Sequence, residues 1–240
     1  MKPRQARLSI RDLQCSAGKR VLFDQLNLDL FDGQCLLLLG PNGSGKTTLL
    51  RSLTGLTRPT GGTISWQAIS GTAGNDPKRR ITSSDDERDA RSQICPRLYQ
   101  GHNSGWKAEL SARENLILQS SLDNSGSESA FTFITTGPAR IQTALERAGI
   151  GAQAELAFGR LSAGQRRRLA LARLMVDSRM IWLLDEPATA LDEQGLRLLA
   201  ELIDQKLADD GLVITATHQN LGLKHTGITL DLAAHERLRA

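Results

Sequence analysis

The sequence predicts an α/β fold with a parallel core sheet, an antiparallel β edge and a helical lobe. A glycine-rich segment, residues 40–47, lies between a run of apolar residues and a helix-like segment, which is the order expected where a parallel strand enters a tight loop. A second apolar run ends in Asp185 and Glu186, and residues 162–232 alternate helix-like and strand-like segments. This alternation is typical of a parallel core whose strands deliver polar residues to one edge.

Composition places the chain among ordinary globular proteins. It has 240 residues, of which 40% are apolar and 23% charged, which fits one domain with two lobes. The net charge is +4, but 30 basic residues are interspersed with 26 acidic ones, so we expect no nucleic acid partner. Cys15, Cys35 and Cys95 have no C-x-x-C spacing, which favours neither a zinc site nor a disulfide framework and fits a reducing compartment.

The first third of the chain reads as strands around one helix. Residues 8–39 contain short β-like runs, and residues 26–30 alternate apolar and polar before a turn at 32–33, so we predict an antiparallel edge sheet. Residues 63–66 predict one further strand. Residues 35–39 predict a buried parallel strand, and residues 47–56 predict the helix that follows the glycine-rich loop.

Two segments of low hydrophobicity interrupt the pattern. Residues 70–92 are rich in Gly, Ser, Asp and Arg, so we expect a mobile surface insertion there. A second polar stretch, residues 123–129, separates helix-like segments at 113–121 and 139–148. The whole of 1–240 is then one domain. We predict a core lobe of about 1–102 and 161–240 and a helical lobe of about 103–160.

The glycine-rich loop predicts a nucleotide site. It matches G-x-x-x-x-G-K-[ST], in which backbone N–H groups converge on phosphate oxygens and the lysine ammonium, here Lys46, reaches the β- and γ-phosphates. The helix that follows adds its dipole to the anion site, and Thr47 is the expected Mg²⁺ ligand. The residues predicted to hold the nucleotide here are Gly40, Pro41, Asn42, Gly43, Ser44, Gly45, Lys46, Thr47 and Thr48.

Acidic and capping residues lie further along the chain. Residues 180–184 predict a buried strand that delivers Asp185, an expected Mg²⁺ ligand, and Glu186, the expected general base for an attacking water. Ser162 and Gln165 form the S-x-x-Q pattern of a capping box before an amphipathic helix at 166–176. Such a capped helix N-terminus is also suited to bind a phosphate.

Residues 161–165, Leu-Ser-Ala-Gly-Gln, resemble the Leu-Ser-Gly-Gly-Gln signature of ABC-type ATPases, which are P-loop NTPases. The resemblance implies hydrolysis of ATP with Mg²⁺, and a head-to-tail homodimer that encloses two ATP molecules. In that dimer Ser162, Gly164 and Gln165 would bind the nucleotide of the opposite subunit. Residues 189–192 are similar to the D-loop, which ends here at Asp192 and crosses the dimer interface. His218, after a predicted strand at 212–216, resembles the switch histidine that contacts the γ-phosphate.

The sequence departs from the family pattern at two places. The aromatic residue that stacks on adenine in many relatives is expected near Ala17, where the sequence reads Ser-Ala-Gly. Counting back from Leu110 places the Q-loop glutamine at His102, while Gln100 lies two residues earlier. Either His102 or Gln100 is therefore the predicted ligand that senses Mg²⁺ and the lytic water.

The segment around His102 also resembles one subfamily. Gly101 and His102, then Gly105, Lys107 and Leu110, followed by Glu-Asn-Leu at 114–116, are similar to the pattern of the CcmA family, ATP-binding subunits of bacterial cytochrome c maturation systems. The resemblance implies a peripheral protein at the cytoplasmic face of the inner membrane. Its partners would be a membrane-spanning CcmB-like subunit and a CcmC-like component, and its complex would export heme or release it on its chaperone.

The sequence is compatible with other functions. The chain has no apolar stretch near 18 residues, so another chain must form any pore, and it has only four histidines and no C-x-x-C-H for heme. The same motor residues would serve another ABC exporter or importer. A non-transport ABC ATPase acting on DNA or ribosomes is disfavoured because no long coiled-coil insertion or second ATPase half is present. An inactive scaffold is disfavoured because Lys46, Asp185, Glu186 and His218 are all present.

Overall fold

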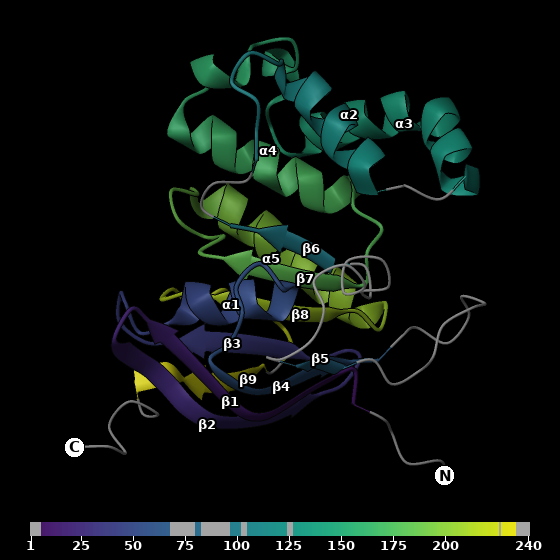
Figure 1. The fold of residues 1–240 in the computed structure, drawn as a ribbon. Helices are drawn as coiled ribbons and strands as arrows, with labels where there is room; N and C mark the ends of the chain where they lie inside the picture. Colours follow the sequence, from purple (N-terminus) through teal and green to yellow (C-terminus); the bar gives the residue numbers. More distant parts are fainter. Residues whose placement is uncertain are drawn as a thin grey trace.

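The molecule consists of stacked layers of secondary structure, seen edge-on in Figure 1. The computed structural model describes residues 6–67, 80–82, 97–101, 105–123, 127–225 and 227–233. A group of helices forms one end of the molecule, a parallel sheet lies in the middle, and an antiparallel sheet forms the other end. Within these described ranges, no helix is both long and apolar enough to cross a bilayer.

The central sheet has five strands in the order β6-β7-β8-β3-β9, and every neighbouring pair is parallel. Its strands are β3 (Cys35–Leu39), β6 (Arg97–Gln100), β7 (Ile181–Asp185), β8 (Leu212–Ala216) and β9 (Ile228–Asp231). All residues of β7 and β8 are buried, because helices cover both faces of the sheet. Helix α1 (Lys46–Thr54) packs on one face, and α5 (Glu193–Ala208) packs on the other.

A four-stranded antiparallel sheet, in the order β2-β1-β4-β5, covers the far side of α1. Its strands are β1 (Leu8–Ala17), β2 (Arg20–Leu30), β4 (Gly61–Trp66) and β5 (Arg80–Thr82). The predicted parallel core and antiparallel edge are therefore both confirmed. Strand β5 was not expected, because it falls within the segment predicted as an insertion; the rest of 70–92 lies outside the described residues.

The helices at the end of the molecule opposite the antiparallel sheet enclose an apolar cluster. It is the third cluster of the chain, after those on the two faces of the parallel sheet. They are α2 (Ala112–Asp123), α3 (Ser127–Arg147), the short 3₁₀ turns η1 (Gly151–Gln153) and η2 (Phe158–Arg160), and α4 (Ala163–Val176). The prediction of a polar loop up to residue 129 and a helix starting at 139 is wrong, since α3 begins at Ser127 and carries Pro138 inside it. Proline normally disrupts a helix interior, so the sequence around Pro138 gives no local sign that one helix runs through it.

Helix α4 packs against the other helices on one side and against α5 and the parallel sheet on the other. Leu169 and Ala172 pack in the third cluster, whereas Leu171 and Leu174 pack against α5 and the parallel sheet. A boundary at residue 161 therefore does not divide the chain into two separately packed parts. The division into lobes at 102 and 161 therefore stays a prediction.

Asn115 fixes the segment that leads from the parallel sheet into α2. Its side chain is fully buried. Its Oδ1 accepts from the Lys107 N–H at 2.9 Å, and its Nδ2 lies 3.0 Å from the carbonyl oxygens of Lys107, Leu110 and Ser111. Glu114 and Ser111 cap the helix start reciprocally. Glu114 and Asn115 of the Glu-Asn-Leu motif therefore hold residues 107–111 in place by hydrogen bonds.

We predict that Asn115→Ala lowers the free energy of unfolding by about 2 to 3 kcal/mol, because it removes a buried side chain that is the hydrogen-bond partner of several partly buried backbone groups. Equilibrium urea denaturation measures this change. Ser121→Ala, which removes one exposed hydroxyl bonded within its own helix, is the control and should change stability by less than about 0.5 kcal/mol. Equal losses in the two variants would contradict the anchoring role.

Candidate functional site

The predicted phosphate loop joins β3 to α1 in the expected strand, loop and helix order. Gly45 immediately precedes α1 with φ of 100°, a left-handed conformation that favours glycine, and a Cβ there would lie 3.2 Å from the Phe23 ring. Lys46 is buried, and its Nζ donates to the carbonyl oxygens of Gly40 at 2.7 Å and Pro41 at 3.1 Å. The ammonium is therefore held over the loop by neutral acceptors.

Ser44 carries a buried hydroxyl in the same loop. Its Oγ has no hydrogen-bond partner among the described residues, and a Cβ placed on Gly40 would lie 2.6 Å from it. A buried hydroxyl without a partner is costly. A ligand carrying acceptor oxygens would satisfy this group, so the loop fits phosphate by its donors as well as by its shape.

Thr47 and Asp185 meet where α1 faces the end of β7. The Thr47 hydroxyl lies 2.9 Å from Asp185 Oδ2 and 3.1 Å from Oδ1. Asp185 is the last residue of β7 and is only 5% exposed. Two residues 138 positions apart in the sequence thus bring a hydroxyl and a carboxylate together at the carboxyl edge of the sheet.

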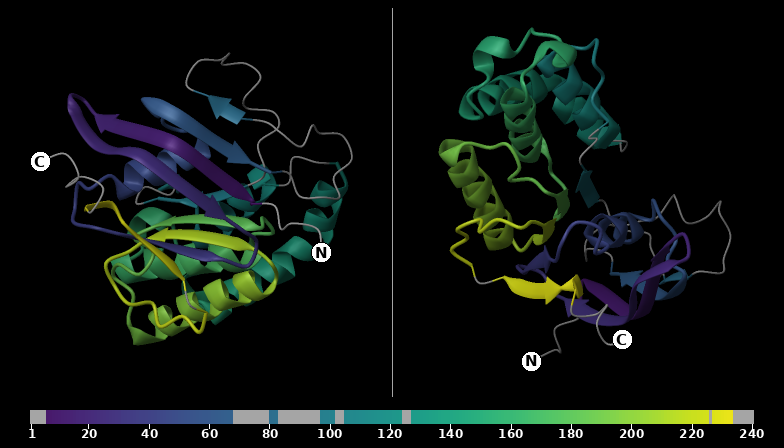
Figure 2. Two further views of the ribbon diagram at one scale, coloured as in Figure 1. Left: turned by 90° about the horizontal axis from the view of Figure 1, so that it is seen from below. Right: turned by 90° about the vertical axis from the view of Figure 1, so that its left-hand side faces the viewer.

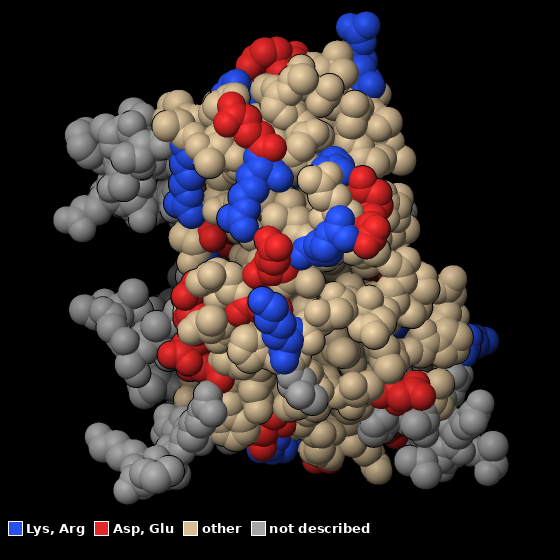
Figure 3. Space-filling view, turned by 180° about the vertical axis from the view of Figure 1, so that it is seen from behind, with Lys and Arg blue, Asp and Glu red and all other residues tan. Residues whose placement is uncertain are grey.

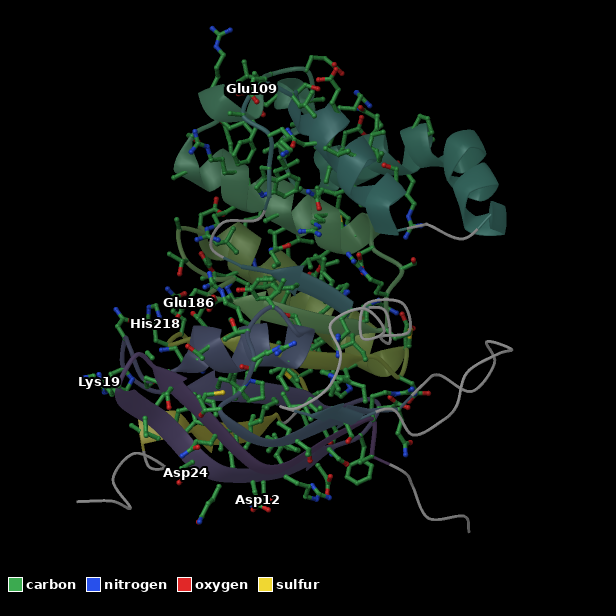
Figure 4. The ribbon with its side chains drawn as sticks, in the orientation of Figure 1. Asp12, Lys19, Asp24, Glu109, Glu186 and His218 are labelled. Carbon is green, nitrogen blue, oxygen red and sulfur yellow. The ribbon has the colours of Figure 1, made fainter. Side chains whose placement is uncertain are left out.

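Glu186 and His218 lie side by side next to this point, as Figure 4 shows. His218 Nδ1 is 3.0 Å from Glu186 Oε2. Because an ionised carboxylate only accepts hydrogen bonds, the Nδ1 nitrogen carries the proton in this contact. Glu186 has φ of 52°, and its N–H donates to the Ala216 carbonyl at 2.9 Å. This left-handed turn redirects the chain directly after β7 and is strained for a residue with a side chain.

These groups surround a cavity of about 250 Å³. Its lining includes six of the nine residues predicted for the phosphate loop, together with two from the antiparallel sheet. They are Ala17, Leu22, Asn42, Gly43, Gly45, Lys46, Thr47, Thr48, Asp185 and Glu186. The structure therefore brings the loop, Asp185 and Glu186 together at one cavity. His218 lies beside this group and contacts Glu186 through Nδ1.

The predicted signature residues lie elsewhere, at the start of α4. Ser162 Oγ accepts from the Gln165 N–H at 3.2 Å, and Gln165 Oε1 accepts from the Ser162 N–H at 2.8 Å. The predicted capping box is confirmed. Asp192 caps α5 through the Gly195 N–H. Neither Ser162, Gly164, Gln165 nor Asp192 belongs to the cavity lining.

The sequence profile of the ABC transporter family matches residues 23–189. The chain belongs to the ABC transporter family. Among curated relatives, it is 37% identical over 214 residues to the cytochrome c biogenesis ATP-binding export protein CcmA of Aliivibrio fischeri, covering 89% of this chain and 93% of the relative. It is 38% identical over 230 residues to the CcmA protein of Nitrosococcus oceani, covering 96% of this chain and 94% of the relative. The predicted resemblance to an ABC ATP-binding subunit and to CcmA is confirmed.

Solved structures of this family share the fold. A putative ABC transporter ATP-binding protein from Pyrococcus furiosus superposes with a TM-score of 0.69 at 23% identity, covering 95% of this chain and 98% of that one. A dimeric ATP-binding cassette in a post-hydrolysis state, bound to ADP and Pi, gives a TM-score of 0.66 at 24% identity and covers 88% of both chains. The ABC ATPase type of α/β fold predicted from the sequence is thereby confirmed.

The two departures from the ABC pattern have different outcomes. Ala17 ends β1 and lines the cavity, so the chain presents a methyl group at the place where an aromatic residue was expected. Gln100 ends β6, is 3% exposed, and its Oε1 has no hydrogen-bond partner among the described residues. His102 lies outside the described residues. The choice between Gln100 and His102 stays a prediction.

Tyr99 is a neighbour of the site that we did not predict from the sequence. In the parallel register of β6 and β7 it pairs with Leu183, two residues before Asp185 and on the same face of the sheet. Burial raises the pKa of the Tyr99 phenol, nearby Arg51 lowers it and nearby Asp185 raises it. Tyr99 therefore links the end of β7 with Arg51 of α1, a contact between distant residues that no local pattern indicates.

Arg168 is the second group that we missed, although the sequence shows it within a triplet of arginines. Its Nη2 lies 2.6 Å from Asp192 Oδ2.

Elsewhere on the molecule charges are mixed: on the face shown in Figure 3, basic and acidic side chains lie next to one another. The basic excess in the composition does not gather into one patch on that face.

We predict that the phenol of Tyr99 ionises above its ordinary pKa and that Asp185→Asn lowers this pKa, because the substitution removes a negative charge that opposes phenolate formation. Tyr99 is the only tyrosine in the chain, so ultraviolet absorbance during an alkaline titration reports this group alone. Circular dichroism defines the pH range in which the chain stays folded. An unchanged or higher pKa in Asp185→Asn would contradict the placement of Tyr99 beside Asp185.

Proposed function

We propose that this chain binds and hydrolyses ATP to drive a transporter complex of cytochrome c maturation. The observation that carries the proposal is the convergence of Lys46, Thr47, Asp185 and Glu186 on one cavity. A phosphate-binding loop, an acidic residue beside a threonine hydroxyl, and a second carboxylate together supply the groups that ATP hydrolysis needs.

Binding of the triphosphate would use the loop and the start of α1. Lys46 Nζ is bonded to two carbonyl oxygens of the loop, and an anionic phosphate is a stronger partner for an ammonium than these neutral acceptors. We infer that the lysine turns from Gly40 and Pro41 toward the β- and γ-phosphates. The backbone N–H groups from Asn42 to Thr48 and the Ser44 hydroxyl complete the predicted site.

Thr47 and Asp185 fit Mg²⁺, since a hydroxyl and a carboxylate are hard oxygen donors and Mg²⁺ is commonly held by one or two carboxylates together with substrate phosphates. The described residues hold no group of three or more His, Cys, Asp or Glu suited to a metal, so these two side chains would depend on the phosphates for a complete set of ligands. When bound, the ion neutralises phosphate charge. Gln100 or His102 is the further ligand that we predict.

We propose that Glu186 acts as the general base. It lines the cavity next to Asp185, and its Oε2 contacts His218. A carboxylate in this position can orient a water molecule and accept its proton as the bond to phosphorus forms. His218 contacts the carboxylate through Nδ1 and its side chain is 63% exposed, so we propose that it takes the switch role at the γ-phosphate that the family implies.

A second copy of the chain would complete each site. Ser162, Gly164, Gln165 and Asp192 lie outside the cavity of their own subunit, which supports a head-to-tail homodimer in the ATP-bound state. The N-terminus of α4 is free to bind the γ-phosphate held by the opposite subunit. Within each chain we keep the proposed division into a core lobe and a helical lobe, with the boundaries given above.

A second, larger cleft suits a membrane-spanning partner. It has a volume of about 580 Å³ and lies between α1, β6 and α2. Its walls combine apolar side chains such as Leu56 and Leu118 with the basic groups Arg51, Lys107 and Arg173. Leu56 is 67% exposed, so its side chain is accessible to a partner. We infer that a CcmB-like subunit docks here and that the motion of the dimer is transmitted through this cleft.

The cargo and location follow the similarity to the CcmA proteins. Those relatives are named as cytochrome c biogenesis export proteins, so we propose that the complex, with CcmB-like and CcmC-like components, exports heme or releases it on its chaperone. The chain would lie peripherally at the cytoplasmic face of the bacterial inner membrane. The same site would serve another ABC exporter or importer equally well, and only the partner and cargo would differ.

We predict that Glu186→Gln lowers the ATP hydrolysis rate on the order of a hundredfold or more, because the amide cannot accept the proton, while ATP binding is retained. Phosphate release measures the rate, and light scattering with ATP should detect a stable dimer. Glu109→Gln, at an exposed glutamate among the helices far from Glu186 (Figure 4), is the control. Full activity in Glu186→Gln would contradict the base assignment, and a monomer in ATP would contradict the composite site.

The cytochrome role is tested in cells with Lys46→Ala, which removes the charge partner of the phosphates. We predict the loss of covalently bound heme from c-type cytochromes, detected by a heme stain of the native bacterium at matched expression of the variant. Lys224→Ala, at an exposed lysine outside the cavity, should leave the stain unchanged. Normal heme attachment in Lys46→Ala would retain the ABC motor and exclude this cargo.

A further inference from the structure

The guanidinium of Arg168 joins three segments that are distant in the sequence. Its Nη1 donates to the carbonyl of Ala148 at 3.0 Å, just past the end of α3. Its Nη2 lies 2.6 Å from Asp192 Oδ2 and 3.3 Å from the side-chain oxygen of Gln194, at the start of α5. Arg168 itself lies in the second turn of α4. The planar fork of an arginine can hold several acceptors in fixed directions at once.

The chain around this guanidinium is shaped to admit it. Gly149 follows Ala148 with φ of 74°, a conformation that favours glycine. A Cβ at Gly149 would lie 2.6 Å from Arg168 Nη1, closer than real Cβ contacts occur. The backbone at the end of α3 therefore passes close to Arg168, and a side chain at position 149 would displace the guanidinium from this place.

Two successive turns of α4 approach the segment 189–192. Gly164 and Arg168 are four residues apart, so they share one face of the helix. A Cβ on Gly164 would reach the Ala190 carbonyl oxygen at 4.0 Å, and one turn later Arg168 holds Asp192. Ala190 has φ of 59°, which marks a tight left-handed bend in this segment. The bend and the ion pair together keep the segment against the signature end of α4.

Asp192 uses both carboxylate oxygens in these contacts. Oδ1 accepts from the Gly195 N–H at 3.0 Å and caps α5, while Oδ2 faces Arg168. The Gly195 N–H and then the Arg168 guanidinium hold the pKa of Asp192 below its usual range. The Arg168 side chain is 17% exposed but that of Asp192 is 60% exposed, so the pair adds little net stability. Its main effect is to fix geometry.

We propose that Arg168 is a positioning residue that holds residues 189–192 against the signature turn of α4, so that both meet the second subunit as one preformed surface. The inference rests on the proposed homodimer. Without the guanidinium, the two segments would have to be brought into register during each dimerisation, and that ordering would weaken association. Binding of ATP to a single subunit would not change, because Arg168 is not part of the cavity lining.

The test uses the full chain with Glu186→Gln, in which hydrolysis is blocked and ATP should support a dimer. Adding Arg168→Met should weaken ATP-dependent dimerisation about tenfold, a cost similar to that of immobilising one side chain at an interface. ATP affinity, measured with a fluorescent ATP analogue at concentrations far below dimer formation, should stay the same. Arg168→Lys keeps the charge near Asp192 but lacks the second arm for Ala148, so it should restore dimerisation in part.

Arg197→Met is the matched control, because it breaks an arginine–glutamate pair with Glu193 on the exposed surface of α5. Its dimerisation should equal that of Glu186→Gln alone. Asp192→Asn keeps an oxygen for the cap and removes the charge, so its effect should not add to that of Arg168→Met. If Arg168→Met lowers the unfolding temperature, the dimerisation of Asp192→Asn in ATP tests the inference in its place.

Unchanged dimerisation in Arg168→Met, or an equal loss in Arg197→Met, would overturn the inference. So would a loss of ATP affinity in the single subunit, because Arg168 would then act on the nucleotide site itself. Additive effects of Arg168→Met and Asp192→Asn would also overturn it. Failure of Glu186→Gln alone to dimerise in ATP is a different result, since it contradicts the proposed homodimer.

Discussion

The site depends on the burial of α1 between two sheets. Leu49, Leu50 and Leu53 are fully buried, and they belong to a cluster that contains strands of both the parallel and the antiparallel sheet. Full burial of one leucine side chain stabilises a fold by about 1.5 to 3 kcal/mol, so this helix cannot shift without a large cost. Its first residues, Lys46 and Thr47, are held in place by the same packing.

The fixed helix explains how distant parts of the chain reach one point. Asp185 arrives from β7 and contacts Thr47, while Glu186 leaves the strand in a left-handed turn and meets His218 beyond β8. Parallel strands end at the same edge of the sheet, so their last residues share a location by topology. Helix α1 supplies the phosphate loop to that edge, and the antiparallel sheet closes the other side.

Local patterns were sufficient to predict most of this framework. The glycine-rich loop, the strand ending at Asp185 and the capping box at Ser162 each have a short sequence signature with a physical basis. The start of α3 was missed because residues 127–129 are polar and because Pro138, inside the helix, is a residue that normally marks a helix boundary. Contacts of Tyr99 and Arg168 were missed because they join residues far apart in sequence, and no periodicity encodes such meetings.

Ala17 at the cavity wall has a consequence for nucleotide selectivity. Stacking of a base on an aromatic side chain is worth on the order of 1 to 3 kcal/mol, and a methyl group offers no comparable surface. Binding at this wall then draws its strength from the triphosphate rather than from the base. We therefore expect the base to contribute little to affinity at this wall, so that other purine triphosphates can compete with ATP for the same loop.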